Sequence, residues 1–304
     1  KAEGAEIKIT VPKPLKVVSN GLLKSIEPSS GYWHTWVWET NYPISSYNIN
    51  FTIGDFKEVK RTGYILDKPL KMIFYTLSND TNKDIELLKS AEEYLSFYAG
   101  LFGQYPWIQE KFGIVQTPYW GMEHQTAIAY GNNHKKTNLG YDFLLFHEIG
   151  HEWWGNSITT NDIADMWIHE GFCTYSEALY VECLYGYDMM IEYVNNQKRF
   201  IRNNSPIVGH YHVNDKGSGD MYHKGSVMLH TLRSLIEDDE LWFSIIGEIS
   251  DKFKYQTIDA KQVMNYIMER TDKDLNVFFS QYLNHSELPE FQYQLIKEGR
   301  HTTL

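Results

Sequence analysis

Residues 147–151 read His-Glu-Ile-Gly-His, and this short segment limits what the chain can fold into more than any other feature. Residues four positions apart on an α-helix lie on one face, about 6 Å apart along the axis, so the imidazoles of His147 and His151 can meet at one metal ion. Glu148 lies about 100° around the helix from His147, beside such an ion instead of on it. That position suits a general base. A helix with two ordinary packed histidines is the alternative.

A catalytic zinc ion needs three protein ligands and an open fourth position, so the third ligand must come from another element. A second helix is predicted over residues 164–184, and its first turns carry Glu170 as the candidate. Glu177 follows nearly two turns later, near the same face, where its carboxylate can accept a hydrogen bond from the free ring nitrogen of His147. A solvated helix charge is the alternative for Glu177. The residues predict one zinc ion per chain, held by His147, His151 and Glu170.

Two longer runs extend this pattern. Residues 147–156 read His-Glu-Ile-Gly-His-Glu-Trp-Trp-Gly-Asn, residues 167–172 read Trp-Ile-His-Glu-Gly-Phe, and 18 residues separate His151 from Glu170. With these motifs the chain resembles the aminopeptidase N family of zinc metallopeptidases, which includes the leukotriene hydrolase type. The resemblance implies a thermolysin-like catalytic domain that hydrolyses the N-terminal peptide bond of peptides. In that reaction Glu148 would be the general base.

Residues 120–124, Trp-Gly-Met-Glu-His, resemble the family's Gly-Ala-Met-Glu-Asn segment on the strand that edges the active site. The resemblance implies that Glu123 binds the free α-amino group of the substrate, while Gly121 and Met122 hold its backbone. A carboxylate near a metal dication is a suitable counter-ion for an ammonium group. The match is partial, because Trp120 replaces the first glycine and His124 the asparagine. A solvent-exposed glutamate and a packed histidine are the alternatives for Glu123 and His124.

A third segment contains a tyrosine that could stabilise the transition state. Residues 221–227, Met-Tyr-His-Lys-Gly-Ser-Val, resemble the family's Tyr-x-Lys-Gly motif, whose tyrosine donates a hydrogen bond to the developing oxyanion. A phenol suits this task because it is neutral at pH 7 and its hydrogen bond strengthens as negative charge builds up. The resemblance therefore assigns this role to Tyr222.

The hydrophobic patterns predict an α+β fold. Short alternating runs broken by turn residues predict β-strands up to about residue 56, whereas later segments, including residues 141–154, have helical periodicity. Together with the resemblance they predict the closing part of an N-terminal β-sheet domain over residues 1–56 and a thermolysin-like catalytic domain over residues 57–285. Residues 286–304 would begin a following β-domain with a strand at 291–296. The resemblance also implies that a second anchor for the substrate amine lies upstream of this sequence.

The composition restricts the classes of binding partner that the chain can have. The net charge of −11 argues against nucleic acid, because phosphate binding favours a basic surface. No membrane span is expected, since the apolar clusters are far shorter than the roughly 20 residues that cross a bilayer. Peptides with a free N-terminus are the expected partners. Cys173 and Cys183 are predicted on one helix, about 15 Å apart and too distant for a mutual disulfide, as buried thiols.

Other functions stay open. A zinc endopeptidase would share the metal chemistry, although Glu123 argues against it because its carboxylate would be buried opposite an uncharged peptide. A catalytically silent peptide-binding fragment of the same fold is a second alternative, against which the intact set of metal ligands and Glu148 speaks. An epoxide-hydrolysing side activity, known in one branch of the family, is compatible with the same residues.

Overall fold

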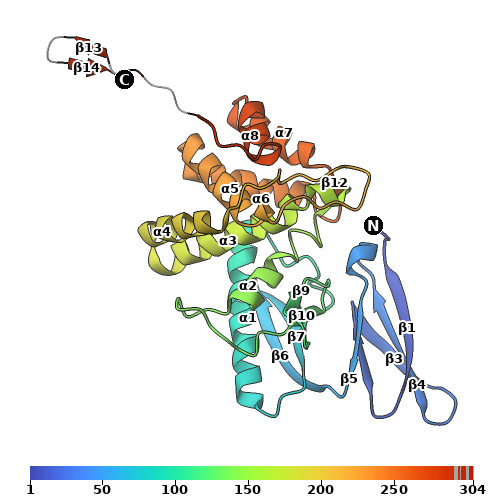
Figure 1. The fold of residues 1–304 in the computed structure, drawn as a ribbon. Helices are drawn as coiled ribbons and strands as arrows, with labels where there is room; N and C mark the ends of the chain where they lie inside the picture. The colour runs from blue at the N-terminus through green and yellow to red at the C-terminus, as the bar shows by residue number, and fades with distance from the viewer. Residues whose placement is uncertain (291–293, 295, 299–300, 304) are drawn as a thin grey trace.

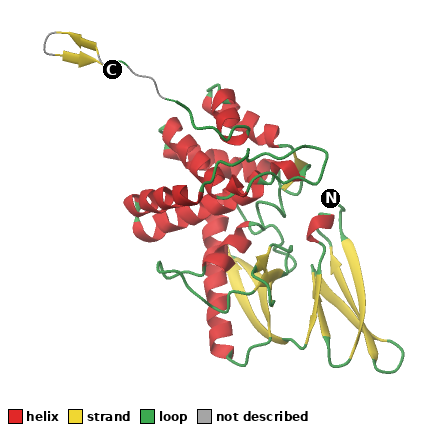
Figure 2. Cartoon of the chain, viewed as in Figure 1, coloured by secondary structure: helices red, strands yellow, loops and turns green. Residues whose placement is uncertain are grey.

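The computed structural model describes residues 1–290, 294, 296–298 and 301–303. From the N-terminus the chain forms a β-sheet region, then a second sheet with a long helix on one side, and then a body of helices (Figure 1). Strands and helices are thus largely segregated along the chain (Figure 2), and the predicted α+β class is confirmed. None of the helices in the described part of the chain has the length and hydrophobicity that crossing a lipid bilayer requires.

The first 54 residues form two small antiparallel sheets. One has the strand order β1-β4-β3 and the other pairs β2 with β5. Their strands are β1 (Ala5–Pro12), β2 (Lys16–Ser19), β3 (Leu22–Pro28), β4 (Trp33–Thr40) and β5 (Phe51–Gly54). Val17, Val18 and Trp38 are buried in the core that these sheets share with the next one. A short 3-10 helix, η1 (Ser46–Asn48), connects β4 to β5.

The second sheet has five strands in the order β6-β7-β8-β10-β9. Its strands are β6 (Lys57–Ile65), β7 (Lys68–Thr76), β8 (Phe112–Gln116), β9 (Gly121–Met122) and β10 (Ile128–Tyr130). Strands β7, β8 and β10 run parallel, whereas β9 is antiparallel to β10 and forms one edge of the sheet. The first residue of β6 is the first residue of the predicted catalytic domain; the domain limits themselves stay a prediction.

The long helix α1 (Thr81–Phe102) packs against β6 and β7. Leu88, Leu95 and Tyr98 are fully buried on one face, whereas the N-terminal end carries exposed polar residues. The apolar residues recur at helical spacing, which makes the helix amphipathic. Its buried face contacts the helix that carries the two histidines, so α1 connects the sheet to the metal site.

The remaining helices form the helical body of the molecule (Figure 1). They are α2 (Phe143–Gly150), α3 (Trp167–Tyr185), α4 (Tyr187–Gln197), α5 (His223–Ile236), α6 (Asp239–Lys252), α7 (Ala260–Thr271) and α8 (Asn276–Leu283). Every residue of α3 from Trp167 to Val181 is buried, because α2, α4 and α5 cover it on different sides. Near the C-terminus, β13 (Ile296–Glu298) pairs antiparallel with β14 (His301–Thr303).

Three expectations need correction or stay untested. The helix predicted over residues 141–154 is shorter, because α2 ends at Gly150 and the next residues form turns. Cys173 and Cys183 both lie on α3 as expected, but only Cys173 is buried, whereas Cys183 near the C-terminal end of the helix is exposed. Most of the strand predicted over residues 291–296 falls outside the described residues.

Candidate metal centre and substrate cleft

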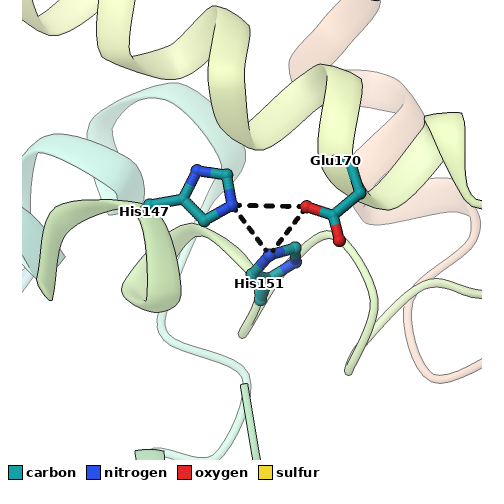
Figure 3. Close-up of side chains that lie close together, drawn as sticks. All are labelled: His147, His151 and Glu170. Carbon is teal, nitrogen blue, oxygen red and sulfur yellow. Dashed lines mark hydrogen bonds and ion pairs between the residues drawn. The ribbon is translucent and has the colours of Figure 1, made fainter. Parts of the chain in front are cut away.

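The three predicted metal ligands meet at one point between α2 and α3 (Figure 3). His147 Nε2 lies 3.2 Å from His151 Nε2 and 3.3 Å from Glu170 Oε2, and His151 Nε2 lies 3.4 Å from the same oxygen. Two ligand atoms about 2.0–2.1 Å from one tetrahedral zinc ion are about 3.3–3.4 Å apart. The donor atoms therefore have the mutual spacing that one zinc shell requires.

The local sequence explains why α2 can deliver both histidines. The Asp142 side chain caps the helix by accepting a hydrogen bond from the Leu145 amide. At the other end Gly150 lets α1 approach closely, since a Cβ there would lie only 2.6 Å from the hydroxyl of Tyr98. His151 caps the C-terminal end of α2, and the chain continues in turns. Its Nδ1 atom donates a hydrogen bond of 2.9 Å to the carbonyl of Trp154.

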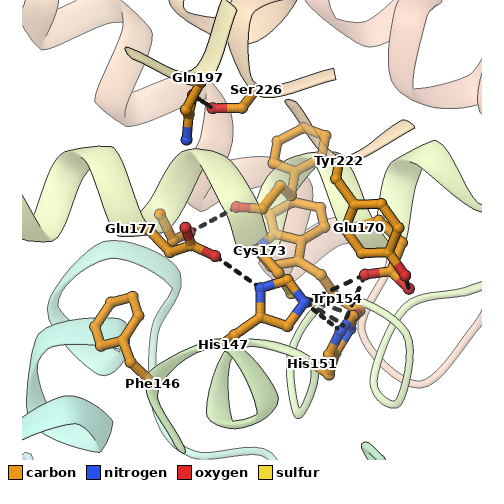
Figure 4. Close-up of polar contacts among 12 residues, drawn as sticks. Phe146, His147, His151, Trp154, Glu170, Cys173, Glu177, Gln197, Tyr222 and Ser226 are labelled. Atoms are coloured by element: carbon orange, nitrogen blue, oxygen red, sulfur yellow. Dashed lines mark hydrogen bonds and ion pairs between the residues drawn. The ribbon is translucent and has the colours of Figure 1, made fainter. Parts of the chain in front are cut away.

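Hydrogen bonds to the second ring nitrogens fix both imidazoles (Figure 4). His147 Nδ1 donates to Glu177 Oε1 at 2.8 Å, and His151 Nδ1 donates to a carbonyl oxygen, which can only accept. Each Nε2 therefore keeps its lone pair for a metal ion. The other oxygen of Glu177 accepts from the hydroxyl of Tyr193 at 2.8 Å, so both carboxylate oxygens have partners. The contact expected between Glu177 and His147 is present.

Glu170 lies in the first turn of α3 and is buried. Burial alone would raise its pKa, but His151 and His147 hold the pKa of Glu170 well below its usual range. Its second oxygen, Oε1, accepts a hydrogen bond of 3.0 Å from the hydroxyl of Tyr222 (Figure 4). The carboxylate is therefore ionised and oriented as a metal ligand.

Glu148 projects from α2 into the cleft. It is buried, and burial raises the pKa of Glu148 to about 7. Its Oε2 has no hydrogen-bond partner among the described residues, which is uncommon for a buried carboxylate. An unpaired carboxylate oxygen whose pKa lies near neutrality is suited to accept and return a proton.

Gly121 on β9 is packed against this carboxylate. A Cβ at position 121 would lie 2.4 Å from Glu148 Oε1 and 2.8 Å from Leu144 Cδ1. We therefore expect Gly121→Ala to displace the Glu148 carboxylate and to lower turnover about 10- to 100-fold, while bound metal stays unchanged. Gly100→Ala on α1 is the matched control, because nothing lies within 4 Å of its added Cβ. Full turnover by the Gly121 variant, measured with metal content, would show that Glu148 does not depend on this contact.

Glu123 lies just beyond β9, and one of its carboxylate oxygens is within 4.8 Å of a carboxylate oxygen of Glu148 and a ring nitrogen of His151. It is only 5% exposed, so the alternative of a solvent-exposed glutamate is wrong. Its Oε1 accepts a hydrogen bond of 3.0 Å from the hydroxyl of Tyr47, a residue of η1. Asn156, the last residue of the long motif, donates to the carbonyl of Glu123 at 2.8 Å. Glu123 is thus oriented by the N-terminal sheet region and by the segment that follows α2.

His124 is a packed histidine, the alternative considered for it in the sequence analysis. Its ring is within hydrogen-bonding distance, 2.9 Å, of the amide nitrogen of Asn50, and burial lowers the pKa of His124 to about 4. The side chain is not part of the cleft lining. Gly121 and Met122 do line the cleft from the edge strand β9, as expected.

Tyr222 reaches the site because two helices approach closely. Gly171 on α3 and Gly225 on α5 face each other, and a Cβ on Gly225 would lie 3.1 Å from the Cα of Gly171. This contact brings the hydroxyl of Tyr222 to Glu170. Burial and the neighbouring Glu170 raise the pKa of Tyr222, so the phenol stays protonated and remains a hydrogen-bond donor.

Together these residues line one cavity of about 560 Å³. Its lining includes the predicted metal ligands, Glu148, Glu123 and Tyr222. Among the lining residues to which the sequence assigned no role are Tyr47, Lys216 and His223. Tyr47 belongs to the region predicted as the closing part of an N-terminal β-sheet domain, residues 1–56. No local pattern indicates that its hydroxyl would meet a carboxylate 76 residues away.

Glu152 is a further residue to which the sequence assigned no role. It directly follows the second histidine, is fully buried, and accepts hydrogen bonds from Tyr105, Trp107, Asn156 and the Thr126 amide. Because Asn156 also holds the carbonyl of Glu123, Glu152 fixes the backbone around that residue. Four donors compensate for much of the cost of burying the carboxylate.

The sequence is similar to a known protein family and to several known proteins. The model of the family described as "Peptidase family M1 domain" matches residues 86–282. Endoplasmic reticulum aminopeptidase 1 of Rattus norvegicus is 23% identical over 278 residues, which cover 84% of this chain and 29% of the relative. Glutamyl aminopeptidase of Sus scrofa is 27% identical over 190 residues, which cover 58% of this chain and 20% of the relative. The chain thus spans less than a third of the length of these relatives.

Solved structures show the same fold. An M1 zinc metallopeptidase mutant from Deinococcus radiodurans, bound to a Tyr-Ser-Ala substrate, superposes with a TM-score of 0.77 at 16% identity. The match covers 94% of this chain and 64% of that protein. The unmutated enzyme of the same organism gives a TM-score of 0.76 with the same coverage.

Proposed function

Because the chain belongs to peptidase family M1, we propose that it carries a zinc-dependent aminopeptidase centre that hydrolyses the N-terminal peptide bond of peptides. One observation carries the proposal: a single cavity combines three convergent donor atoms, the Oε2 atom of Glu148, which has no hydrogen-bond partner among the described residues, and the buried carboxylate of Glu123. This combination provides a metal site, a base and an ammonium site within reach of one substrate.

His147, His151 and Glu170 would hold one zinc ion per chain, because their donor atoms have the spacing of one tetrahedral shell. When bound, the ion supplies a Lewis acid that polarises a carbonyl group and lowers the pKa of water. The hydrogen bond from His147 to Glu177 keeps the imidazole in the tautomer that this task needs.

Glu148 performs the proton transfers. Its carboxylate accepts a proton from the attacking water and passes it to the nitrogen of the leaving amine. The raised pKa near 7 makes both transfers possible at neutral pH. Tyr222 donates its phenolic hydrogen to the oxygen on which negative charge develops, from a position beside Glu170.

Glu123 selects the end of the substrate. Its buried carboxylate is the natural counter-ion of the free α-ammonium group, and the hydroxyl of Tyr47 holds it in place. Fixing the ammonium group fixes the distance to the scissile bond, which yields removal of one residue at a time. Gly121 and Met122 on the open edge of the sheet would pair with the substrate backbone.

The test compares peptides that differ only in an N-terminal acetyl group. Acetylation removes the ammonium charge and leaves Glu123 without its partner, at a cost of about 2 to 5 kcal/mol. We expect kcat/KM to fall by a factor of about 30 to several thousand. In Glu123→Gln this preference should shrink sharply with metal content unchanged, whereas the surface variant Glu86→Gln on α1 should keep it.

The same measurement separates the alternatives. Equal cleavage of acetylated and free peptides, with internal bonds among the products, would replace the aminopeptidase proposal by an endopeptidase. Glu123 argues against that outcome, because an uncharged peptide would leave its buried carboxylate without a cationic partner.

A further inference from the structure

A second cavity of about 680 Å³ adjoins the cleft. Tyr222 and His223 line both cavities, whereas Glu123, Gly121 and Met122 line only the first. The second cavity therefore extends the cleft past Tyr222, on the side away from the site proposed for the substrate amine. A peptide whose amino end is held at Glu123 would direct its leaving group toward this cavity.

Two arginines line the second cavity, Arg199 at the centre of η3 (Lys198–Phe200) and Arg202 just after it. Both are exposed, and neither has a carboxylate within ion-pair distance among the described residues. The other arginines in the described ranges do have one: Arg61 pairs with Glu92, Arg233 with Glu182 and Asp239, and Arg270 with Glu248. Among the arginines that the structure describes, the two left without a carboxylate are thus those at this cavity, in a sequence with 39 acidic and 28 basic residues.

The one carboxylate in the cavity wall does not neutralise them through contact. Asp220 is buried, and its two oxygens accept hydrogen bonds from the backbone amides of Arg202 at 2.9 Å and Asn203 at 2.7 Å. Asp220 therefore positions the backbone that carries Arg202 and leaves the guanidinium group free. Lys216 adds a further exposed cation without a carboxylate partner in the described part of the chain, at the wall of the first cavity.

We propose that Arg199 and Arg202 bind a carboxylate on the leaving-group side of the substrate. This inference rests on the proposed aminopeptidase function, which places the substrate amine at Glu123. The carboxylate is either the C-terminus of a short peptide or the side chain of an acidic residue. A guanidinium group binds carboxylates through two parallel hydrogen bonds, which gives direction as well as charge. The cleft then selects peptides with an ammonium group at one end and a carboxylate at the other.

The experiment uses matched short peptides, from two to five residues, with a free C-terminal acid or a C-terminal amide. Because both arginines are exposed, we expect the acid to be preferred by about 5- to 30-fold in kcat/KM at low ionic strength for at least one length. The preference should weaken as salt is added. In the double variant Arg199→Gln, Arg202→Gln the preference should disappear. Neither guanidinium group forms a hydrogen bond with another described residue, so the substitutions remove no internal contact of that kind.

A second set of peptides, with Asp or Asn after the cleaved residue, identifies the source of the carboxylate. An acid-over-amide preference that depends on the arginines assigns the site to the C-terminus, and an Asp-over-Asn preference with the same dependence assigns it to a side chain. Equal rates in both sets, or a preference that survives in the double variant, would overturn the inference. Lys60→Gln on β6, at the opposite edge of the sheet from β9, is the control for loss of positive charge.

Two further measurements separate this inference from the proposed function. Amino-acid arylamides carry no carboxylate, so their turnover by the double variant reports the aminopeptidase centre alone. Binding of the acid and amide peptides to Glu148→Gln, measured by calorimetry, tests the arginines without any turnover. The inference is supported if Glu148→Gln binds the acid more tightly than the amide and the triple variant Glu148→Gln, Arg199→Gln, Arg202→Gln binds both equally. Equal binding of acid and amide to Glu148→Gln contradicts it.

Discussion

Replacing Glu148 by glutamine is expected to lower kcat about a thousandfold to ten-thousandfold, while the protein keeps its metal. Glutamine has nearly the same shape, but its amide cannot take a proton from water at neutral pH. The Oε2 atom of Glu148 has no hydrogen-bond partner among the described residues, so the substitution breaks no internal contact of that oxygen. The loss is therefore expected in kcat and not in folding.

The measurement is turnover of an unblocked amino-acid arylamide, with zinc content determined on the same sample. Glu192→Gln, an exposed glutamate on α4, is the control for the loss of one negative charge. A Glu148 variant with near-normal turnover would mean that another group accepts the proton.

Removing the metal should abolish activity completely. A chelator should extract about one zinc ion per chain, and added zinc should restore turnover, because three protein ligands leave the ion exchangeable. Glu170→Gln removes a ligand and should prevent zinc binding at ordinary concentrations. Glu177→Gln only weakens the hydrogen bond that orients His147, so we expect a loss of about 10- to 100-fold in zinc affinity.

The graded order of these two variants is the informative result, and metal titration measures it directly. If Glu177→Gln bound zinc as tightly as the unsubstituted protein, Glu177 would not support the site. An active protein without zinc would end the proposal. Full zinc occupancy with no turnover of unblocked arylamides would favour the alternative of a silent peptide-binding fragment.

Much of the metal centre could be predicted because its geometry is local. Helical periodicity alone places His147 beside His151 and aligns Glu177 with Glu170, and the structure brings all four together. The resemblance to the aminopeptidase N family is confirmed by the family match. It supplied what periodicity could not, namely Tyr222 and Glu123, which approach the site from other elements.

The remaining features depend on contacts between segments that are distant in sequence. The meeting of Tyr47 with Glu123 is such a contact, and so is the set of donors around Glu152. The end of α2 at Gly150 was missed as well, because residues 151–154 continue the apolar helical pattern although they form turns. Cys183 is exposed because neighbouring helices cover α3 only up to about Val181.

The hydrogen bond from Tyr47 to Glu123 has a thermodynamic consequence. It joins the N-terminal sheets to the cleft, and two neighbouring contacts do the same: Asn48 donates to Asn156, and Asn20 donates to the carbonyl of Gln125. Occupation of the site at Glu123 and the folding of the N-terminal sheets are therefore linked equilibria. Linkage is reciprocal, so a change that destabilises η1 would lower the affinity of the proposed site for the substrate amine. An amine bound at Glu123 would stabilise the folded N-terminal sheets by the same free energy, although it does not contact them.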